Sequence, residues 1–291
     1  MAHAKPKRRF LRFRMRTVLL AMTVLCFLLA WIALKADRAR KQRRVVDWVR
    51  QLGGQVTYDT DDDDVPDPFG SGPFAKDEGW LRENFGVDFF DNVVAVTLEG
   101  EDFADISKLA ALRDVRDLCL TGTSVSNLSV LAGMSHLDSL TIYGSSVYNW
   151  DESQMEYARS PVKDLSPLSA TTRLRRLTLN VTSVSDLTPV AKMTNLQELS
   201  LIDSPVSDIS PLAGLTSLQL LDLRGTSVSD LSPLAGMQRL QRLDLQQTTV
   251  TELSPLAGMT RLKWLNLNAV SSVKDLKGLT RLTKLGHLDL S

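Results

Sequence analysis

A 22-residue segment that recurs almost unchanged limits the folds open to this chain of 291 residues. Residues 210–231 read SPLAGLTSLQLLDLRGTSVSDL, and residues 232–253 read SPLAGMQRLQRLDLQQTTVTEL. A fixed period of this length is typical of a solenoid, in which each unit has an apolar side that only its neighbours can bury. We therefore expect the repeats to stack into one elongated domain with a continuous core.

Each repeat predicts a short strand, a turn and a short helical segment. Leu221 and Leu223 alternate with Asp222, so the two leucines should face the core and Asp222 the opposite side of the strand. Ser232 suits the N-cap of a helix, and Pro233 suits its first position. The strands are predicted to pair in parallel into a curved sheet, with short helical or 3₁₀ turns on the convex side.

The repeats are predicted to occupy residues 93–291 and to supply about nine strands. Successive strands lie 22 residues apart, except for one interval of 37 residues and a final interval of 23 residues. The longer interval predicts an insertion of 15 residues at 148–162. The apolar pairs that mark the strands are Val96/Leu98, Leu118/Leu120, Leu140/Ile142, Leu177/Leu179, Leu199/Leu201, Leu221/Leu223, Leu243/Leu245, Leu265/Leu267 and Leu288/Leu290.

The residues before the leucine pattern resemble a known family. Residues 206–213 read VSDISPLA and residues 228–235 read VSDLSPLA. This is similar to the leucine-rich repeat family, most closely its bacterial internalin-like type, and the resemblance covers roughly two-thirds of the chain. It implies an α/β solenoid. The family usually has Asn after the strand, whereas this chain has hydroxyls that should form a weaker ladder: Thr123, Ser145, Thr182, Ser204, Thr226 and Thr248.

The first residues predict a membrane anchor. A basic tail, residues 1–16, precedes the uncharged residues 17–34, which are about long enough for one transmembrane helix. Lys35, Arg38 and Arg40 follow directly, and this favours an uncleaved anchor over a cleaved signal peptide. Binding of these basic flanks to nucleic acid is the less favoured interpretation, because membrane-interface residues explain them. We expect a single-pass membrane protein and no nucleic-acid partner.

Residues 35–92 are predicted to form a juxtamembrane helix and a region that caps the first repeat. Residues 38–52 carry an apolar stripe at helical spacing, residues 55–59 read as a strand, and residues 76–85 as a second short helix. The acidic residues 61–64 lack the order of a calcium loop and indicate a solvated loop. The runs FRMRTVLLAMTVL, LGGQVTYD and DFFDNV together resemble the front end of membrane-anchored leucine-rich repeat proteins of planctomycete-type bacteria.

The charges that flank residues 17–34 hardly determine the orientation of this segment in the membrane. The two flanks carry seven and six Lys and Arg residues, so the positive-inside rule barely discriminates. Long domains cross membranes with little regard to their charge, and we expect the repeats outside the cytoplasm. Cys119 argues mildly the other way, since oxidising compartments disfavour lone thiols. The sequence ends at Ser291 directly after a strand, so we expect an open strand edge there unless the natural product is longer.

The sequence shows no pattern that indicates catalysis, a metal or a cofactor. The histidines His3, His136 and His287 are far apart in the repeat register, and Cys26 should lie in the membrane, away from Cys119. A catalytic protein is therefore the least favoured class. We expect Cys119, between Leu118 and Leu120, to be an inert side chain on the concave face rather than a reactive thiol.

The concave face and the insertion are the expected binding surface. Aromatic and Arg residues are enriched in interface cores, and they stand here among acidic and apolar groups. We predict a protein partner, or a glycan as the second choice; the alternative is a structural or adhesive envelope protein without one specific ligand. The candidate partner-binding residues are Tyr143, Tyr148, Trp150, Tyr157, Arg176, Ile202, Leu220, Arg224, Arg242 and Trp264.

Overall fold

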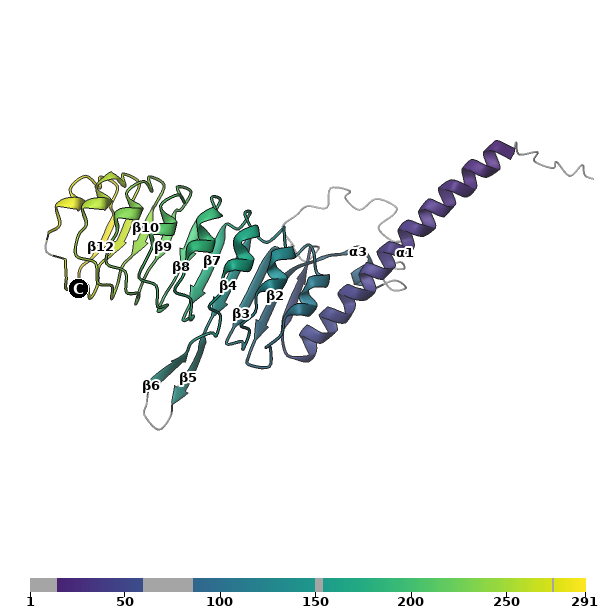
Figure 1. Cartoon of the computed structure of the whole chain (residues 1–291), viewed down its shortest axis with the longest axis horizontal. Helices are drawn as coiled ribbons and strands as arrows, with labels where there is room; N and C mark the ends of the chain where they lie inside the picture. The colour runs from purple at the N-terminus through teal and green to yellow at the C-terminus, as the bar shows by residue number, and fades with distance from the viewer. Residues whose placement is uncertain (1–14, 60–85, 150–153, 274) are drawn as a thin grey trace, which may run out of the picture.

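The computed structural model describes residues 15–59, 86–149, 154–273 and 275–291 as a solenoid preceded by a long helix (Figure 1). Ten strands form one sheet in the order β1-β2-β3-β4-β7-β8-β9-β10-β11-β12, and β5 and β6 form a separate hairpin. All pairs in the main sheet are parallel except the antiparallel pair of β1 with β2. The prediction of a leucine-rich repeat solenoid with nine parallel strands is confirmed, and β1 adds a tenth.

The helices and strands alternate along the chain with one 3₁₀ turn for each coil. The helices are α1 (Met15–Gln51) and α3 (Val87–Phe90). The strands are β1 (Gln55–Tyr58), β2 (Val93–Glu99), β3 (Asp117–Thr121), β4 (Ser139–Tyr143), β5 (Ser145–Asn149), β6 (Gln154–Ala158), β7 (Arg176–Asn180), β8 (Glu198–Ser200), β9 (Leu220–Asp222), β10 (Arg242–Asp244), β11 (Trp264–Asn266) and β12 (His287–Asp289). The 3₁₀ turns are η1 (Ser107–Ala111), η2 (Ser129–Gly133), η3 (Ser166–Ala170), η4 (Thr188–Lys192), η5 (Ser210–Leu212), η6 (Ser232–Leu234), η7 (Ser254–Gly258) and η8 (Lys277–Leu279).

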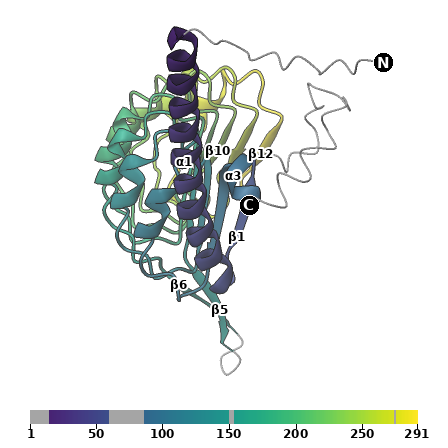
Figure 2. The ribbon, with the colours of Figure 1, turned by 90° about the vertical axis from the view of Figure 1, so that its right-hand side faces the viewer.

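The core runs along the solenoid between the sheet and the stacked 3₁₀ turns (Figures 1 and 2). Leu199, Leu221 and Leu243 occupy equivalent positions in three consecutive strands, and all three are fully buried. Leu223 and Leu234 of the same coil are also fully buried. The leucine spacing therefore predicted the burial correctly, because each strand is fixed in register by the leucines of its neighbours.

The 3₁₀ turns begin differently from the prediction. Ser232 is the first residue of η6 and not its cap. The carboxylate of Asp230 accepts the Ser232 N–H at 2.8 Å and the Ser232 hydroxyl at 2.7 Å, and these bonds lower the pKa of Asp230. An acidic or amide side chain bonding the N–H two residues on is a common turn motif. Most of the other 3₁₀ turns start with the same kind of bond. In η3, for example, the Ser166 N–H donates to the Asp164 carboxylate.

The predicted juxtamembrane helix is continuous with the predicted transmembrane helix, and together they form α1, which has 37 residues. The part from Val18 is long and apolar enough to cross a membrane by its length and composition. The other end of α1 covers the first coil: Val46 and Val49 are buried in the solenoid core, and Trp48 packs edge-on against Phe103 with ring centroids 5.5 Å apart. One helix thus carries both an exposed apolar segment and part of the core.

The insertion forms the β5–β6 hairpin, which projects from one rim of the solenoid (Figure 1). The coil resumes at Ser160, which pairs with Thr182, and Val162 is fully buried. The interrupting residues are therefore 145–159 and not 148–162. The predicted boundary was shifted because the triplets 145–147 (SSV) and 160–162 (SPV) both fit the repeat.

The predicted hydroxyl ladder exists only in part. Thr182 and Ser204 bond each other at 3.0 Å, and the Ser204 hydroxyl also reaches the Leu179 carbonyl of the neighbouring coil. Thr226 and Thr248 instead bond the carbonyls three residues earlier in their own turns, each at 2.6 Å. Ser145 lies in β5, so Ser160 takes the ladder position. A hydroxyl is too short to bridge coils regularly, and the stack is held mainly by backbone pairing and leucines.

Several predicted features lie outside the described residues. These are the basic residues 1–14, the acidic loop at 61–64, the short helix at 76–85 and Trp150.

One backbone position recurs in the left-handed region in successive coils. Val181, Asp203, Gly225, Gln247 and Ala269 follow one another at intervals of 22 residues, with φ between 52° and 65°. This conformation costs an L-residue roughly 1–2 kcal/mol but suits glycine. Of these five positions, only 225 has glycine, the residue that adopts this conformation without strain.

We predict that Gln247→Gly stabilises the folded protein by roughly 0.5–1 kcal/mol, because Gln247 is exposed and the backbone strain removed exceeds the conformational entropy that glycine adds to the unfolded chain. Gly225→Gln should destabilise it, since φ is 65° there and a new Cβ would collide with the Asp203 carboxylate. Denaturant unfolding of both variants measures the difference. A lower unfolding midpoint for Gln247→Gly would contradict this account of the turn.

Candidate functional site

The strand register aligns three columns of residues on the concave face, namely those before, between and after the two buried apolar residues of each strand. The first column comprises the residues before the first buried leucine of each strand, and the register aligns Glu198, Leu220, Arg242, Trp264 and His287 across five neighbouring strands. Neighbouring strands lie about 4.8 Å apart, so side chains in a column can touch. The first column is therefore the natural place for a continuous surface patch.

Three side chains of the first column stack on one another. The guanidinium carbon of Arg242 lies 4.0 Å from the centroid of the Trp264 ring. The Trp264 and His287 rings are 5.4 Å apart and nearly parallel, with 4° between their planes. Trp264 belongs to β11, between β10 and β12, so one face of the indole is covered by Arg242 and the other by His287. Cation–π and ring-stacking contacts favour this arrangement of the row in the absence of a partner.

The second column is largely occupied with supporting the turns. The Asp222 carboxylate accepts the Arg224 N–H and its guanidinium Nε at 3.2 and 3.0 Å. Asp244 accepts the Gln246 N–H at 3.1 Å, and Asn266 accepts the Asn268 N–H at 2.9 Å. Asp222, Asp244 and Asn266 are buried. This column therefore orders the loops that follow the strands and offers few groups to a partner.

Arg224 joins two carboxylates of neighbouring strands. Its guanidinium lies 2.8 Å from Asp222 and 3.4 Å from Asp244. The hydrogen bond to Asp222 raises the pKa of Arg224, and burial raises the pKa of Asp244. A raised carboxyl pKa means that ionised Asp244 costs stability as the pH rises through its folded pKa. The positive charge of Arg224 offsets part of this cost, because it lowers the pKa of Asp244.

The remaining predicted residues lie at different places along the concave face. Leu220 is half-exposed beside Arg242 of the stack, Ile202 is half-exposed after β8, and Tyr143 is half-exposed at the end of β4. Arg176 forms an ion pair with Asp117 at 3.2 Å, across Ser139 of the intervening strand. Five predicted residues thus gather toward the C-terminal coils, namely Ile202, Leu220, Arg224, Arg242 and Trp264, while Tyr143 and Arg176 lie toward the hairpin.

The hairpin carries two further predicted positions. The pairs Ser146↔Tyr157 and Tyr148↔Met155 place positions 148 and 157 on one face of the hairpin. At its base, Arg159 donates to the Thr182 carbonyl at 3.1 Å and to the Asp203 carbonyl, so the hairpin is fastened to two coils. The strand that follows the hairpin, β7, and the strand that contains Trp264, β11, are separated by four strand spacings, or about 19 Å.

The place of His287 in the stack was not predicted from the sequence. The signal for it is the repeat register, which aligns His287 with Trp264 and Arg242.

The described residues hold no group of three His, Cys, Asp or Glu side chains that could bind a metal ion. Cys119 is half-buried on β3, with its sulfur 3.5 Å from the Thr121 hydroxyl. The expected absence of an enzyme activity stays a prediction.

Comparisons with known proteins agree with the fold. A family described as Leucine Rich repeats (2 copies) matches residues 194–236. An internalin (InlF) from Listeria monocytogenes is 35% identical with a TM-score of 0.56, and the match covers 64% of this chain and 51% of that chain. Internalin C2 from the same species is 27% identical with a TM-score of 0.59, covering 68% of this chain and 81% of that chain.

A leucine-rich repeat protein from Leptospira interrogans is 20% identical over 66% of this chain and 46% of that chain, with a TM-score of 0.54, and it is similar in fold alone. A comparison with curated protein sequences finds no match. This chain spans about half the length of the InlF structure. The resemblance of the first hundred residues to planctomycete-type proteins stays a prediction.

Proposed function

We propose that this chain, a leucine-rich repeat protein of the internalin-like type, is anchored in a membrane by α1 and binds a protein partner on its concave face. Leucine-rich repeat domains typically mediate interactions between proteins, and their curvature creates extended concave binding surfaces. The proposed site comprises Ile202, Leu220, Arg224, Arg242, Trp264 and His287, which we call the concave patch.

The stack of Arg242, Trp264 and His287 carries this proposal. Binding hot spots are enriched in Trp and Arg, and they are effective when their side chains are ordered before binding. Leu220, aligned with Arg242 in the neighbouring strand, supplies apolar surface next to the stack. An ordered cationic and aromatic row beside an exposed leucine is the composition that a protein interface core favours.

The same stack disfavours a glycan. An aromatic side chain that binds a sugar presents an open ring face to it, whereas both faces of Trp264 are covered by Arg242 and His287. Trp264 therefore lacks the open ring face on which a sugar would stack. A structural or adhesive envelope protein remains the alternative, and it predicts no single saturable partner.

We predict that Trp264→Ala weakens partner binding by about 2 kcal/mol or more, roughly 30-fold in Kd. The partner would first be captured in cells by a photo-crosslinking amino acid at position 220, on the concave face. Position 235, exposed on the convex side of the same coil, serves as the matched control. Affinity is then measured by calorimetry with the purified partner.

Three results would count against the concave patch. These are crosslinks of equal yield at positions 220 and 235, binding that does not saturate, or an unchanged Kd for Trp264→Ala in a variant that melts like the wild type. Equal yields without saturation would favour the adhesive alternative.

The hairpin is the second part of the proposed interface, because a projecting insertion on one rim often belongs to the binding face of a solenoid. Deleting residues 145–159 joins Gly144 to Ser160 and restores the sequence Gly-Ser-Pro-Val, whose last three residues match Ser204, Pro205 and Val206 of a regular coil. We expect this variant to fold and to bind the partner roughly tenfold more weakly. Unchanged affinity in the folded variant would remove the hairpin from the interface.

We further propose that the repeats lie outside the cytoplasm. Protease added to intact spheroplasts should then digest the repeat domain, while a cytoplasmic control protein stays protected. Digestion only after lysis would reverse the orientation, and recovery of the whole chain in the soluble fraction would refute the anchor.

A further inference from the structure

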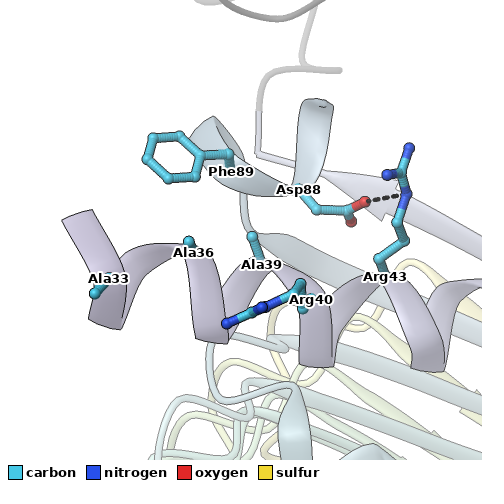
Figure 3. A pocket seen from close by; sticks show the side chains of 7 residues that line it. All are labelled: Ala33, Ala36, Ala39, Arg40, Arg43, Asp88 and Phe89. Atoms are coloured by element: carbon cyan, nitrogen blue, oxygen red, sulfur yellow. Dashed lines mark ion pairs between the residues drawn. The ribbon is translucent and has the colours of Figure 1, made fainter. Parts of the chain in front are cut away.

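Two hollows lie between α1 and α3, directly beyond the apolar segment of α1. Their volumes are about 280 and about 390 Å³, and both are lined by Ala39, Asp88 and Phe89. Figure 3 shows the smaller hollow, with Ala33, Ala36 and Ala39 along α1 and with Asp88 and Phe89 opposite them. The two hollows share Ala39, Asp88 and Phe89 but take their other α1 residues from different faces of the helix, and we call the larger hollow the juxtamembrane groove.

The larger hollow changes from apolar to cationic along α1. Trp31 and Leu34 line one end, and Lys35 and Arg38 follow within the next turn. The Lys35 ammonium lies 5.4 Å from the Trp31 ring centroid and 5.1 Å from that of Phe89. Arg38 is exposed and makes no ion pair with any residue in the described part of the chain. The groove therefore presents positive charge just above aromatic and aliphatic surface.

This change of polarity falls at the level of a membrane surface. The uncharged residues 17–34 are about long enough to cross the hydrocarbon core, so Leu34 lies at its edge. Trp31 then lies at the hydrocarbon boundary, where Trp is enriched. At 1.5 Å per residue, Arg38 lies about 10 Å further along the helix, in the layer of headgroups.

We infer that the juxtamembrane groove binds an anionic phospholipid of the phosphatidylglycerol kind. Its phosphate contacts Lys35 and Arg38, and its glycerol and upper acyl carbons lie along Trp31, Leu34 and Ala39. This inference rests on the proposed insertion of α1 into a membrane.

The acidic residues of the groove are compatible with this ligand. The Asp88 carboxylate accepts hydrogen bonds from Gln42 at 3.2 Å and from the Tyr58 hydroxyl at 2.9 Å, and Arg43 lies 3.8 Å from it. Its charge is thus already engaged by the protein. Asp114, which is exposed at the rim, can accept hydrogen bonds from the hydroxyls of a glycerol headgroup.

The test uses the full chain in nanodiscs of phosphatidylcholine with a minor fraction of phosphatidylglycerol. Lipid retained after mild detergent extraction is counted by native mass spectrometry. The wild type should retain phosphatidylglycerol in preference to phosphatidylcholine. Lys35→Gln with Arg38→Gln should lower that retention roughly tenfold or more, because each cation near an anionic lipid surface contributes about 1 kcal/mol.

The matched control is Lys41→Gln with Arg44→Gln, which removes the same charge from the same helix outside both hollows. It should change retention less than about twofold. Equal losses in the two double variants, or no preference in the wild type, would overturn the inference, provided that both variants melt like the wild type. Displacement of the lipid by millimolar inorganic phosphate would show a site for free anions and would also overturn it.

Flotation with phosphatidylcholine vesicles separates this inference from the anchor. If the protein floats but shows no preference for phosphatidylglycerol, the anchor is supported and the lipid site is refuted. If the protein does not float, both are refuted.

Discussion

The structure depends on the burial of leucines between coils that cannot bury them alone. Each coil contributes a flat layer of apolar side chains, and a layer becomes dry only when another covers it. Truncating one such leucine to alanine typically costs about 2–5 kcal/mol, so a shift of register in one coil would be costly in two. This constraint fixes the strands in register, and the register in turn places every second residue on the concave face. The stack of Arg242, Trp264 and His287 is a consequence of that alignment.

No repeat precedes the first coil, and α1 covers the apolar side chains that a preceding repeat would bury. Val46 and Val49 enter the core, and β1 pairs antiparallel with β2 so that the edge of the sheet is covered. Because this cap is the end of the helix that carries the exposed apolar segment, the helix axis is fixed relative to the first coil. A partner bound on the concave patch is then held in a set direction from α1, and the juxtamembrane groove lies where the helix meets the repeat domain.

The first and second columns of the concave face differ in what their side chains already bond. Second-column side chains such as Asp222 and Asp244 bond backbone N–H groups within the solenoid and are buried. First-column side chains bond mainly to one another, through weak contacts between cations and rings, and they keep exposed surface. Partner binding is therefore expected from the first column, while substitutions in the second should act mainly on stability.

The amino-acid sequence alone was enough to determine the solenoid, the nine parallel strands, the buried leucines and the apolar segment of α1. These features follow from the period of the apolar residues and from composition, which need no knowledge of distant contacts. Tertiary structure alone decided that the hairpin begins at Ser145 and that the end of α1 packs on the first coil. It also decided that both faces of Trp264 are covered. Each of these depends on which neighbouring atoms come within bonding distance, and two triplets that fit the repeat equally well, SSV and SPV, are distinguished only by the pairing of Ser160 with Thr182 across coils.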